Sequence, residues 1–278
     1  MVDIAVIILT KNEKLHMGRC LERLQALEAT RVIVVDCFST DGTQQIAREC
    51  GAEVVEHIWP GNQAAQFNWA LDNLPLANQW ILRLDADEYL LPETMEEIKN
   101  ILPRLSPDVT SVSMSRARRW FGHPILHGGH DLWFTRLFRT GFARYPEGQV
   151  MDEHLEVSSG REIKLVGHFV DDSLIDFASW QAKHRDYAHR EAFAYWERRC
   201  CQGNESGTTC GSEQGRRKKA LYDKLPLFLR AVLYFCLRYF LLRGFLDGRA
   251  GLSWNFWQGL WYRWIVDCEI VKLRKGVK

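Results

Sequence analysis

Runs of apolar residues alternate with helical patterns along the first hundred residues of the chain. Continuous aliphatic and β-branched runs predict buried strands at 4–9, 31–36, 52–57 and 80–84. Apolar residues at helical spacing predict helices at 17–27, 44–50, 63–74 and 92–105. Strands that alternate with helices in this way indicate an α/β fold, in which a mostly parallel sheet has helices on both faces.

The pattern changes beyond residue 105. Shorter strands are predicted at 110–115, 132–139 and 163–168, followed by a helix at 176–199. Residues 202–215 are rich in Gly, Ser and Thr and are typical of a linker. We therefore expect one large domain at 1–201, with halves at 1–105 and 106–201, and an amphipathic helical appendage at 216–278.

The C-terminal appendage is strongly basic, although the whole chain has a formal net charge of only +1. Residues 216–278 carry 14 Lys and Arg against 4 Asp and Glu, whereas residues 1–215 carry 22 against 31. This polarity indicates a polyanionic partner for the appendage, either nucleic acid or an anionic membrane surface. No helix-turn-helix, zinc-finger or RNA-binding motif accompanies it, so we expect no nucleic acid partner.

Two patterns in the appendage favour a membrane surface as its partner. The stretch at 226–242 is apolar except for Arg230 and Arg238, and the seven residues between them fall far short of the roughly 20 that cross a bilayer. A helix lying among lipid headgroups would let both arginines reach outward. Four tryptophans then recur at helical spacing and predict one aromatic stripe, namely Trp254, Trp257, Trp261 and Trp264. The alternative is a stripe that packs against protein, within this chain or in a homo-oligomer.

Three carboxylates, Asp85, Asp87 and Glu88, lie within four positions at the end of the apolar run at 80–84. In an extended segment alternate side chains point to the same side, so Asp85 and Asp87 are expected to share one divalent cation and the diphosphate bound to it. Solvated surface acid is the alternative for a pattern as short as Asp-x-Asp.

Polar motifs also follow the other predicted strands. Because ligands of parallel sheets bind beyond the carboxyl ends of the strands, we expect Thr10, Asp36 and Asp85 to meet in one cleft. Asp41, in the same loop as Asp36, is expected to cap a helix rather than bind a ligand. The motifs that converge there are Thr10-Lys-Asn-Glu13, the segments 36–43 and 85–88, and Asp152-Glu153-His154.

This set of motifs resembles the inverting family-two glycosyltransferases, which have the GT-A fold, a Rossmann-like nucleotide-diphospho-sugar transferase fold. More narrowly, it is similar to bacterial lipopolysaccharide-core and exopolysaccharide β-glycosyltransferases, which also continue into a Pro-led apolar tail with a Gly-Phe-Leu-Asp-Gly motif, here 244–248. The resemblance implies that a hexose moves from a nucleotide-diphosphate sugar, expected to be a UDP-sugar, to a lipid-linked saccharide. It also implies a location at the cytoplasmic face of a bacterial inner membrane.

The resemblance assigns donor binding to residues 1–105. Asp36 would accept a hydrogen bond from the nucleotide base, which needs a fixed carboxylate, or it could cap a helix. Thr10, Asn12 and Glu13 would line the nucleoside pocket. Whether the base is uracil or guanine stays open.

The resemblance also implies a metal ion. Asp85 would contact the ribose or a metal-bound water, beside Ala86, and Asp87 would bind Mg²⁺ or Mn²⁺, hard cations that prefer oxygen ligands. His168 would complete the metal shell from a late strand, although a purely structural histidine is the alternative.

Acceptor binding would fall to residues 106–201. Inverting transfer needs a carboxylate that takes the proton of the acceptor hydroxyl. The resemblance gives this role to Glu153, with Asp152 as the competitor. Three further residues match a Lys-His-x-x-Tyr helix of relatives and are expected to face the acceptor, with plain packing as the alternative: Lys183, His184 and Tyr187.

Two other functions use similar features. A nucleotidyltransferase also employs an Asp pair and a metal, but it normally has a Gly-rich phosphate loop after the first strand, and residues 10–13 are not one. A non-catalytic scaffold that binds nucleotide sugars or membranes is the second alternative. The eight cysteines show no C-x-x-C spacing, so neither a disulfide framework nor a zinc module is indicated.

Overall fold

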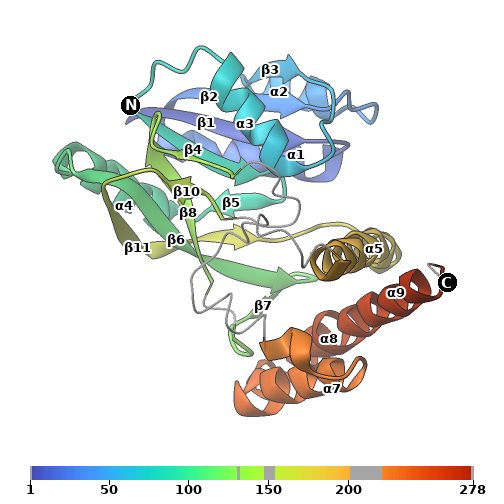
Figure 1. Cartoon of the computed structure of the whole chain (residues 1–278). Coiled ribbons are helices and arrows are strands. Elements are labelled where there is room, and N and C mark those ends of the chain that lie inside the picture. Colours follow the sequence, from blue (N-terminus) through green and yellow to red (C-terminus); the bar gives the residue numbers. More distant parts are fainter. Residues whose placement is uncertain (1, 130–131, 147–153, 201–220, 277–278) are drawn as a thin grey trace. The chain divides into compact units, whose positions relative to one another are not determined.

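The structure is a computed structural model that describes residues 2–129, 132–146, 154–200 and 221–276. The chain forms two compact units (Figure 1). The first unit comprises Met1–Phe121 and Asp131–Leu174, and the second comprises Gly122–His130 and Ile175–Lys278. The boundary therefore differs from the predicted one at 201, because helix α5 (Phe177–Cys200) groups with the C-terminal helices.

The first unit is an α/β layer structure. Its strands are β1 (Val2–Thr10), β2 (Ala29–Asp36), β3 (Glu53–Glu56), β4 (Trp80–Asp85), β5 (Glu88–Leu90), β6 (Val109–Trp120), β8 (Trp133–Arg139), β9 (Ala143–Arg144), β10 (Glu156–Val157) and β11 (Arg161–Asp171). Its helices are α1 (Lys14–Leu24), η1 (Gln25–Leu27), α2 (Thr43–Glu49), α3 (Gln63–Asn73), α4 (Pro92–Ile101) and η2 (Leu102–Arg104).

One sheet organises this unit, with its strands in the order β3-β2-β1-β4-β8-β6-β11-β5. Strands β3, β2, β1 and β4 run parallel, and β8 joins them antiparallel between β4 and β6. Leu9 lies opposite Asp85 and Thr10 lies opposite Asp36. This register brings the carboxyl ends of β1, β2 and β4 to one edge of the sheet, where ligands bind in such folds.

Alternation along β1 explains why both faces of the sheet are covered. Ile4, Val6 and Ile8 point into a core that α1 and α4 cover, whereas Ile7 and Leu9 point into a second core that α3 covers. The four isoleucine and valine side chains have no exposed surface, and Leu9 is 8% exposed. A strand buried on both faces has to be apolar throughout, which is the pattern of 4–9.

The predicted strands and helices of the first unit are present, with ends displaced by a few residues. One expectation about the acidic motif is wrong. Strand β4 ends at Asp85, and residues 86–87 form a turn into β5. Asp85 and Asp87 are therefore not alternate residues of one extended strand, and strand periodicity does not place them on the same side.

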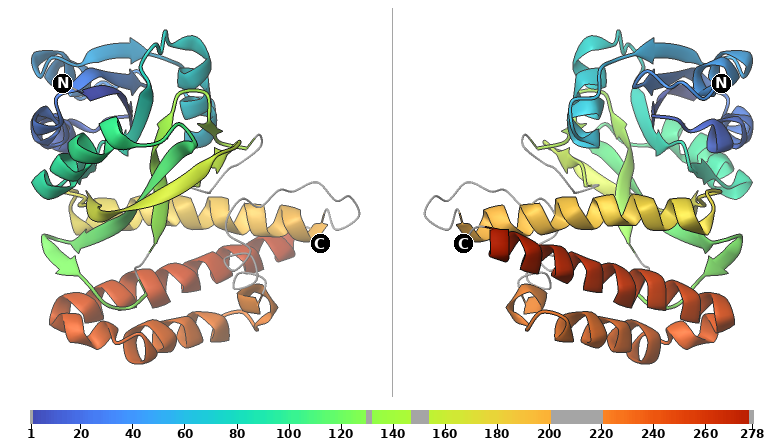
Figure 2. Two further views of the ribbon diagram at one scale, coloured as in Figure 1. Left: turned by 90° about the vertical axis from the view of Figure 1, so that its left-hand side faces the viewer. Right: turned by 90° about the vertical axis from the view of Figure 1, so that its right-hand side faces the viewer.

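The second unit is mainly helical. Its elements are β7 (His123–Ile125), α5 (Phe177–Cys200), α7 (Leu229–Cys236), the π-helix η3 (Leu237–Leu241), the 3₁₀ turn η4 (Gly244–Asp247), α8 (Gly248–Trp254), the π-helix η5 (Asn255–Trp261) and α9 (Tyr262–Gly276). Helices α5 and α9 run side by side (Figure 2) and bury a shared cluster that includes Ala188, Ala192 and Ile270.

The Gly-Phe-Leu-Asp-Gly motif has a structural role in this unit. The carboxylate of Asp247 accepts hydrogen bonds from the backbone amides of Leu126 and His127, at 3.0 and 2.9 Å, and from His127 Nδ1 at 2.7 Å. Gly244 and Gly251 allow two turns to touch, because a Cβ on Gly251 would lie 2.2 Å from the Gly244 oxygen. The motif therefore joins the C-terminal helices to the segment at 122–129.

The two arginines of the apolar stretch do not reach outward, so that expectation is wrong. Arg230 is 2% exposed and pairs with Asp267, which is fully buried. Arg238 is 6% exposed and donates from Nε to the Gly128 carbonyl at 3.0 Å. Buried charges need such partners, and both arginines find them inside the unit.

The tryptophans likewise do not form one exposed stripe. Trp254 is 3% exposed, and Trp257 and Trp261 pack against each other at 5.5 Å between ring centroids. Trp257 also meets Phe177 of α5, while Trp264 is 42% exposed. The intramolecular alternative thus holds for most of the stripe. Within the described residues, no helix has both the length and the apolar content needed to cross a membrane.

Candidate active site

The loop that follows β2 is organised around Asp36. One oxygen of its buried carboxylate accepts from the Ser39 amide and from Gln44 Nε2, both at 2.7 Å. The other accepts from Thr10 Oγ1 at 2.8 Å and from Ser39 Oγ at 2.5 Å. Burial alone would raise the pKa of Asp36, but the hydrogen bonds from Ser39, Gln44 and Thr10 outweigh it and hold the pKa below its usual value.

Four hydrogen bonds fill the acceptor capacity of one carboxylate. In this conformation Asp36 therefore ties the end of β1 to the loop after β2. That Asp36 accepts a hydrogen bond from a nucleotide base stays a prediction.

Further hydrogen bonds join the loops that follow β1 and β2. The Asn12 amide donates to Ser39 Oγ at 2.7 Å, and Asn12 Oδ1 accepts from the Thr40 amide at 3.0 Å. Asp41 accepts from the amides of Lys14 and Thr43, each at 3.0 Å, and so caps the starts of α1 and α2 together. The prediction that Asp41 is a helix cap is confirmed.

Glu13 belongs to a hydrogen-bonded chain through a buried histidine. The Leu174 amide donates to His16 Nε2 at 2.8 Å, so the proton of the neutral ring is on Nδ1. His16 Nδ1 in turn lies 2.6 Å from Glu13 Oε2. The chain fixes the Glu13 carboxylate beside the loop that carries Thr10 and Asn12.

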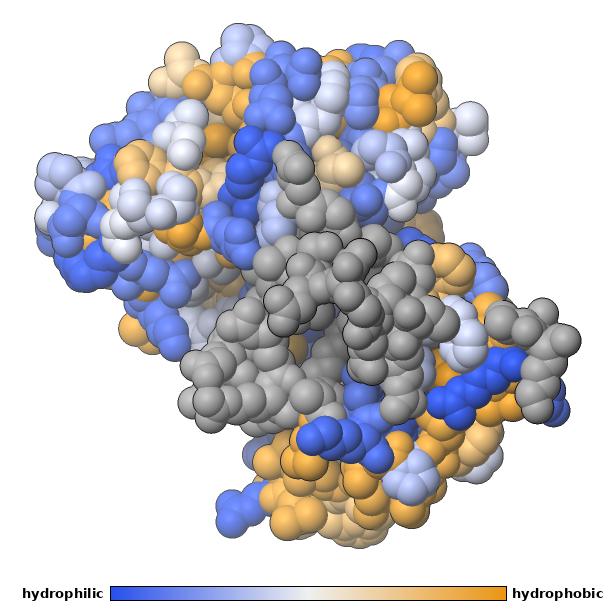
Figure 3. Space-filling view, in the orientation of Figure 1, coloured by the Kyte–Doolittle hydropathy of each residue, from blue (hydrophilic) through white to orange (hydrophobic). Residues whose placement is uncertain are grey.

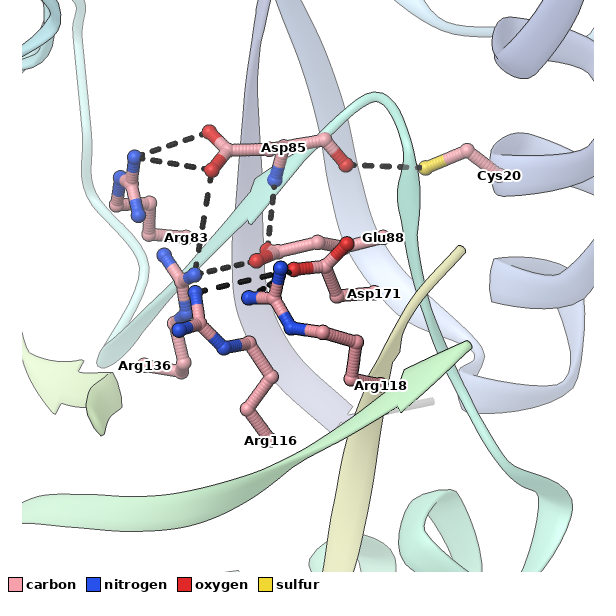
Figure 4. Close-up of polar contacts among 8 residues, drawn as sticks. All are labelled: Cys20, Arg83, Asp85, Glu88, Arg116, Arg118, Arg136 and Asp171. Carbon is pink, nitrogen blue, oxygen red and sulfur yellow. Dashed lines mark hydrogen bonds and ion pairs between the residues drawn. The ribbon is translucent and has the colours of Figure 1, made fainter. Parts of the chain in front are cut away.

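The acidic motif after β4 lies against arginines (Figure 4). Arg83 Nη2 donates to Asp85 Oδ1 at 2.9 Å, and Arg136 pairs with Glu88. The Asp85 amide donates to Glu88 Oε2 at 3.0 Å, which closes the turn between β4 and β5. Burial raises the pKa of Glu88 well above its ordinary value, as do Asp85 and Asp87, while Arg83 opposes them.

A second acid–arginine group adjoins the first. Asp171, at the end of β11, lies 2.8 Å from Arg118 Nη2 and 3.8 Å from Arg116 Nη1, both on β6. Among the residues drawn in Figure 4, four arginines thus face three carboxylates. Such a site suits an anionic ligand, because guanidinium groups bind phosphate oxygens in a fixed geometry.

Two predicted site residues lie in the turn between β4 and β5. Ala86 is 3% exposed, and the half-buried Asp87 uses its backbone carbonyl to accept from the Asp172 amide at 3.2 Å. The charge of Asp87 contributes to the raised pKa of Glu88. Asp87 therefore lies close to the carboxylate cluster.

His168 is not brought to this cluster. It pairs in register with Ser115, and its Nδ1 lies 2.5 Å from Ser115 Oγ. Phe169 packs under Arg136, with 4.6 Å between the guanidinium carbon and the ring centroid, and Asp171 faces Arg118. Because side chains alternate along a strand, His168 points to the opposite face of the sheet from Phe169 and Asp171. Its role as a metal ligand stays a prediction.

The predicted catalytic bases, Asp152 and Glu153, lie outside the described residues. The next residue, His154, is described, and its ring stacks on Phe134 with centroids 5.0 Å apart. Phe134 also lies 4.6 Å from the guanidinium carbon of Arg116 and 5.5 Å from that of Arg136. His154, the residue that follows the acidic motif, therefore lies beside the arginine cluster.

The three predicted acceptor residues belong to the second unit. His184 stacks on Trp180 at 3.7 Å, and its Nδ1 lies 2.9 Å from the Trp180 carbonyl. Tyr187 lies 5.6 Å from the His184 ring, and the ammonium of Lys183 lies 5.9 Å from the Tyr187 ring. They form one packed group on α5, and their contact with an acceptor stays a prediction.

The acidic motif after β4 offers oxygen ligands of the kind that hard metal ions prefer. In the described part of the chain, no group of three or more His, Cys, Asp or Glu is arranged to hold a metal ion. Mg²⁺ is usually bound by one or two carboxylates together with substrate phosphates and water. Asp85 and Asp87 supply such a pair, so the residues fit a metal that arrives with a diphosphate.

Arg83 was not predicted as a site residue from the sequence. It is 1% exposed and lies among the apolar residues of β4. An arginine inside a buried strand needs a carboxylate or another acceptor, since an unpaired charge there is costly. That signal would have connected Arg83 with the acidic motif two residues further on.

Comparison with known proteins identifies the family. The model of glycosyl transferase family 2 matches residues 5–158, more than half of the chain. The chain belongs to glycosyl transferase family 2. The match covers the loops after β1, β2 and β4 and includes the acidic segment at 152–153.

Sequence relatives agree with this family. The chain is 38% identical over 108 residues to an uncharacterized glycosyltransferase of Rickettsia felis, and 36% identical over 108 residues to one of Rickettsia prowazekii. These matches cover 39% of this family 2 chain, and 37% and 36% of the two relatives. The chain thus matches little more than a third of the length of either relative.

A solved structure shows a similar fold over nearly the whole chain. The mannosyltransferase PcManGT of Pyrobaculum calidifontis, in complex with GDP-Man and Mn²⁺, matches with a TM-score of 0.51 and 16% identity. The match covers 97% of this chain and 87% of that one. The predicted family 2 identity and GT-A fold are confirmed.

Proposed function

We propose that this family 2 protein is an inverting glycosyltransferase that moves a hexose from a nucleotide-diphosphate sugar to a lipid-linked saccharide. The observation that carries the proposal is the convergence at the carboxyl ends of β1, β2 and β4. Thr10, Asp36 and Glu13 lie in one hydrogen-bonded loop group, and Asp85 lies beside Arg83 and Arg136. This is the edge at which α/β sheets bind nucleotides.

The arginine-lined acidic cluster suits the diphosphate of the donor. Arg83 and Arg136 hold Asp85 and Glu88, and Arg116 and Arg118 hold Asp171. Asp85 and Asp87 would hold Mg²⁺ or Mn²⁺ together with the diphosphate, as PcManGT does carry Mn²⁺ with GDP-Man. The metal supplies positive charge near the departing nucleoside diphosphate.

The chain's own residues provide orientation and proton transfer. The loops cross-linked by Asn12, Ser39 and Asp41 would hold the nucleoside, and a uridine nucleotide is the expected donor. Glu153, or Asp152 beside it, would take the proton of the acceptor hydroxyl as that oxygen attacks the anomeric carbon. The lipid-linked acceptor and the cytoplasmic face of a bacterial inner membrane belong to this proposal.

A donor panel tests the proposal. The protein is incubated with Mn²⁺ and UDP-glucose, UDP-galactose, UDP-N-acetylglucosamine or GDP-mannose, and release of nucleoside diphosphate is measured. We expect release from one donor, and we expect it to rise when a lipid extract that contains acceptor is added. Binding of a donor without release under any of these conditions would instead favour a non-catalytic scaffold.

A further inference from the structure

Helix α7 and the π-helix η3 have an inverted polarity. Their two charged side chains, Arg230 and Arg238, point inward and are 2% and 6% exposed. Large apolar side chains occupy the outward side, with exposed fractions from 43% to 74%. We call this the apolar face, and it comprises Leu233, Leu237, Phe240, Leu241, Phe245 and Leu246.

The apolar face runs along three consecutive elements. Leu233, Leu237, Phe240 and Leu241 are exposed along α7 and η3, and Phe245 and Leu246 are exposed in η4. Figure 3 shows an orange area where Figure 1 places α7 and α8. Soluble monomers rarely expose apolar surface of this extent without an interaction partner.

The inward position of the arginines indicates that the outward side of this helix is not adapted to contact with water. A helix selected for aqueous solvent would turn its charges outward and its leucines inward. Here the Arg230 guanidinium is held by Asp267, with Nε 2.8 Å from Oδ1, and Arg238 is held by the Gly128 carbonyl. These internal partners leave the opposite side of the helix entirely apolar.

The charges at the rim of the apolar face are cationic. Arg243 and Arg249 are exposed, whereas the acid of this stretch, Asp247, has a side chain only 4% exposed and is held by Leu126 and His127. Positive charge beside exposed Leu and Phe complements an anionic lipid surface. A protein partner is less well matched, because leucine is under-represented among the residues that dominate such interfaces.

We propose that the apolar face docks into the headgroup region of an anionic phospholipid bilayer, with Arg243 and Arg249 at the lipid phosphates. The inference deepens the membrane part of the proposed function, on which it rests, by naming the surface that makes the contact. It replaces the tryptophan stripe as the docking element, since Trp254 is buried and Trp257 and Trp261 pack inside the unit.

Vesicle binding tests the docking surface without any sugar transfer, so its failure is separate from failure of the proposed function. The full chain is sedimented with vesicles of phosphatidylcholine alone, or with about a third of phosphatidylglycerol. We expect binding mainly to the anionic vesicles. The triple variant Leu237→Gln, Leu241→Gln, Phe245→Gln should bind about tenfold more weakly or worse, because affinity scales with the buried apolar area.

One control variant and one further test variant make the result specific. Val166→Gln changes an apolar side chain that is 84% exposed on β11 and should bind vesicles like the wild type. Arg243→Gln with Arg249→Gln should remove the preference for anionic lipid. Equal circular dichroism spectra and unfolding midpoints verify that each variant is folded.

Three outcomes would overturn the docking proposal. The wild type does not bind either kind of vesicle, or the triple variant binds as well as the wild type. Alternatively, light scattering shows that the wild type is a dimer and the triple variant a monomer, which would assign the apolar face to a second copy of the chain.

Discussion

Arg83 and Asp85 are neighbours on the same side of β4, with Arg83 Nη2 2.9 Å from Asp85 Oδ1. The buried arginine thus fixes the position of the first carboxylate of the acidic motif. Arg136 Nη2, 3.9 Å from Asp85 Oδ2, adds a second positive charge. Substitution of Asp85 therefore affects folding as well as chemistry, whereas Asp87 lies in the turn beyond the strand and gives a cleaner test.

Asp87→Ala should lower nucleoside diphosphate release by about a hundredfold or more, because Asp87 would hold the metal ion whose positive charge stabilises the leaving diphosphate. Asp72→Ala is the matched control, since Asp72 is a 54% exposed carboxylate whose ion pair with Arg144 lies on the surface. It should leave release unchanged. Equal rates of release for the two variants would show that Asp87 has no role in the reaction.

Glu153→Gln should reduce transfer to an acceptor by about 10²–10⁴-fold while leaving donor binding intact, because it removes the general base. Asp152→Asn should retain most of the activity. Transfer rates and the dissociation constant of the nucleotide sugar are measured for both. The reverse pattern would assign the base to Asp152.

Asp36→Asn should lower the free energy of unfolding by about 1–3 kcal/mol near neutral pH, since hydrogen-bond donors of Thr10, Ser39 and Gln44 lose a charged acceptor. The folded pKa of Asp36 is lowered, so its contribution to stability is present above the unfolded pKa of about 3.9 and is lost as the pH falls through the folded pKa.

The difference between the wild type and Asp36→Asn should therefore be constant from neutral pH to about pH 5 and shrink below about pH 4. Urea unfolding at several pH values measures it. The exposed Asp72→Asn should show no such trend, and a difference that grows on acidification would contradict the assigned role of Asp36.

Arg230 and Asp267 form a buried ion pair whose single substitutions should be severe. Arg230→Met should lower the free energy of unfolding by about 3–5 kcal/mol, because the buried Asp267 loses its partner, and Asp267→Asn should cost less, because Arg230 keeps Asp223 at 3.3 Å. The double variant should recover more than half of the loss caused by Arg230→Met, since the amide oxygen introduced at position 267 would still accept from the Phe228 amide, now 2.7 Å from the Asp267 carboxylate. Lys272→Ala, at an exposed pair, should leave the unfolding midpoint unchanged.

Two glycines should respond to alanine in opposite directions. Gly18 lies within α1, and a Cβ there would meet Ile46 at an ordinary 3.8 Å, so Gly18→Ala should stabilise the protein by about 0.5–1 kcal/mol. Gly251→Ala would place its Cβ 2.2 Å from the Gly244 oxygen and should destabilise by about 1–3 kcal/mol. Thermal unfolding distinguishes the two, and a tolerated Gly251→Ala would contradict the close contact.

The central sheet was predictable because its strands are apolar on both faces and each ends in a polar loop. Strand β5 was not, since three residues carry no measurable periodicity and its pairing with β11 joins positions about 80 residues apart. The turn at 86–87 was missed for a related reason. The polar motif was assumed to continue the strand, whereas the Asp85 amide bonded to Glu88 closes a turn.

The acidic residues of the candidate site were predicted from the sequence, whereas the position of the arginines beside them was not. Acidic motifs at strand ends are visible in sequence, but Arg116, Arg118 and Arg136 come from strands whose order depends on tertiary pairing. The prediction for the C-terminal tryptophans was wrong for a different reason. The spacing of Trp254 to Trp264 is helical, but the π-helix η5 inserts extra residues per turn and changes which side chains point inward.

The segment at 122–129 interrupts the first unit in sequence yet is hydrogen-bonded to the C-terminal helices. Gly128 donates to the Leu242 carbonyl at 2.9 Å, and Asp247 accepts from Leu126 and His127. A chain cut after residue 174 would leave these amides without their acceptors, so the 122–129 segment would lose its hydrogen bonds in such a fragment. Expression trials should therefore keep the C-terminal helices, or remove the 122–129 segment with them.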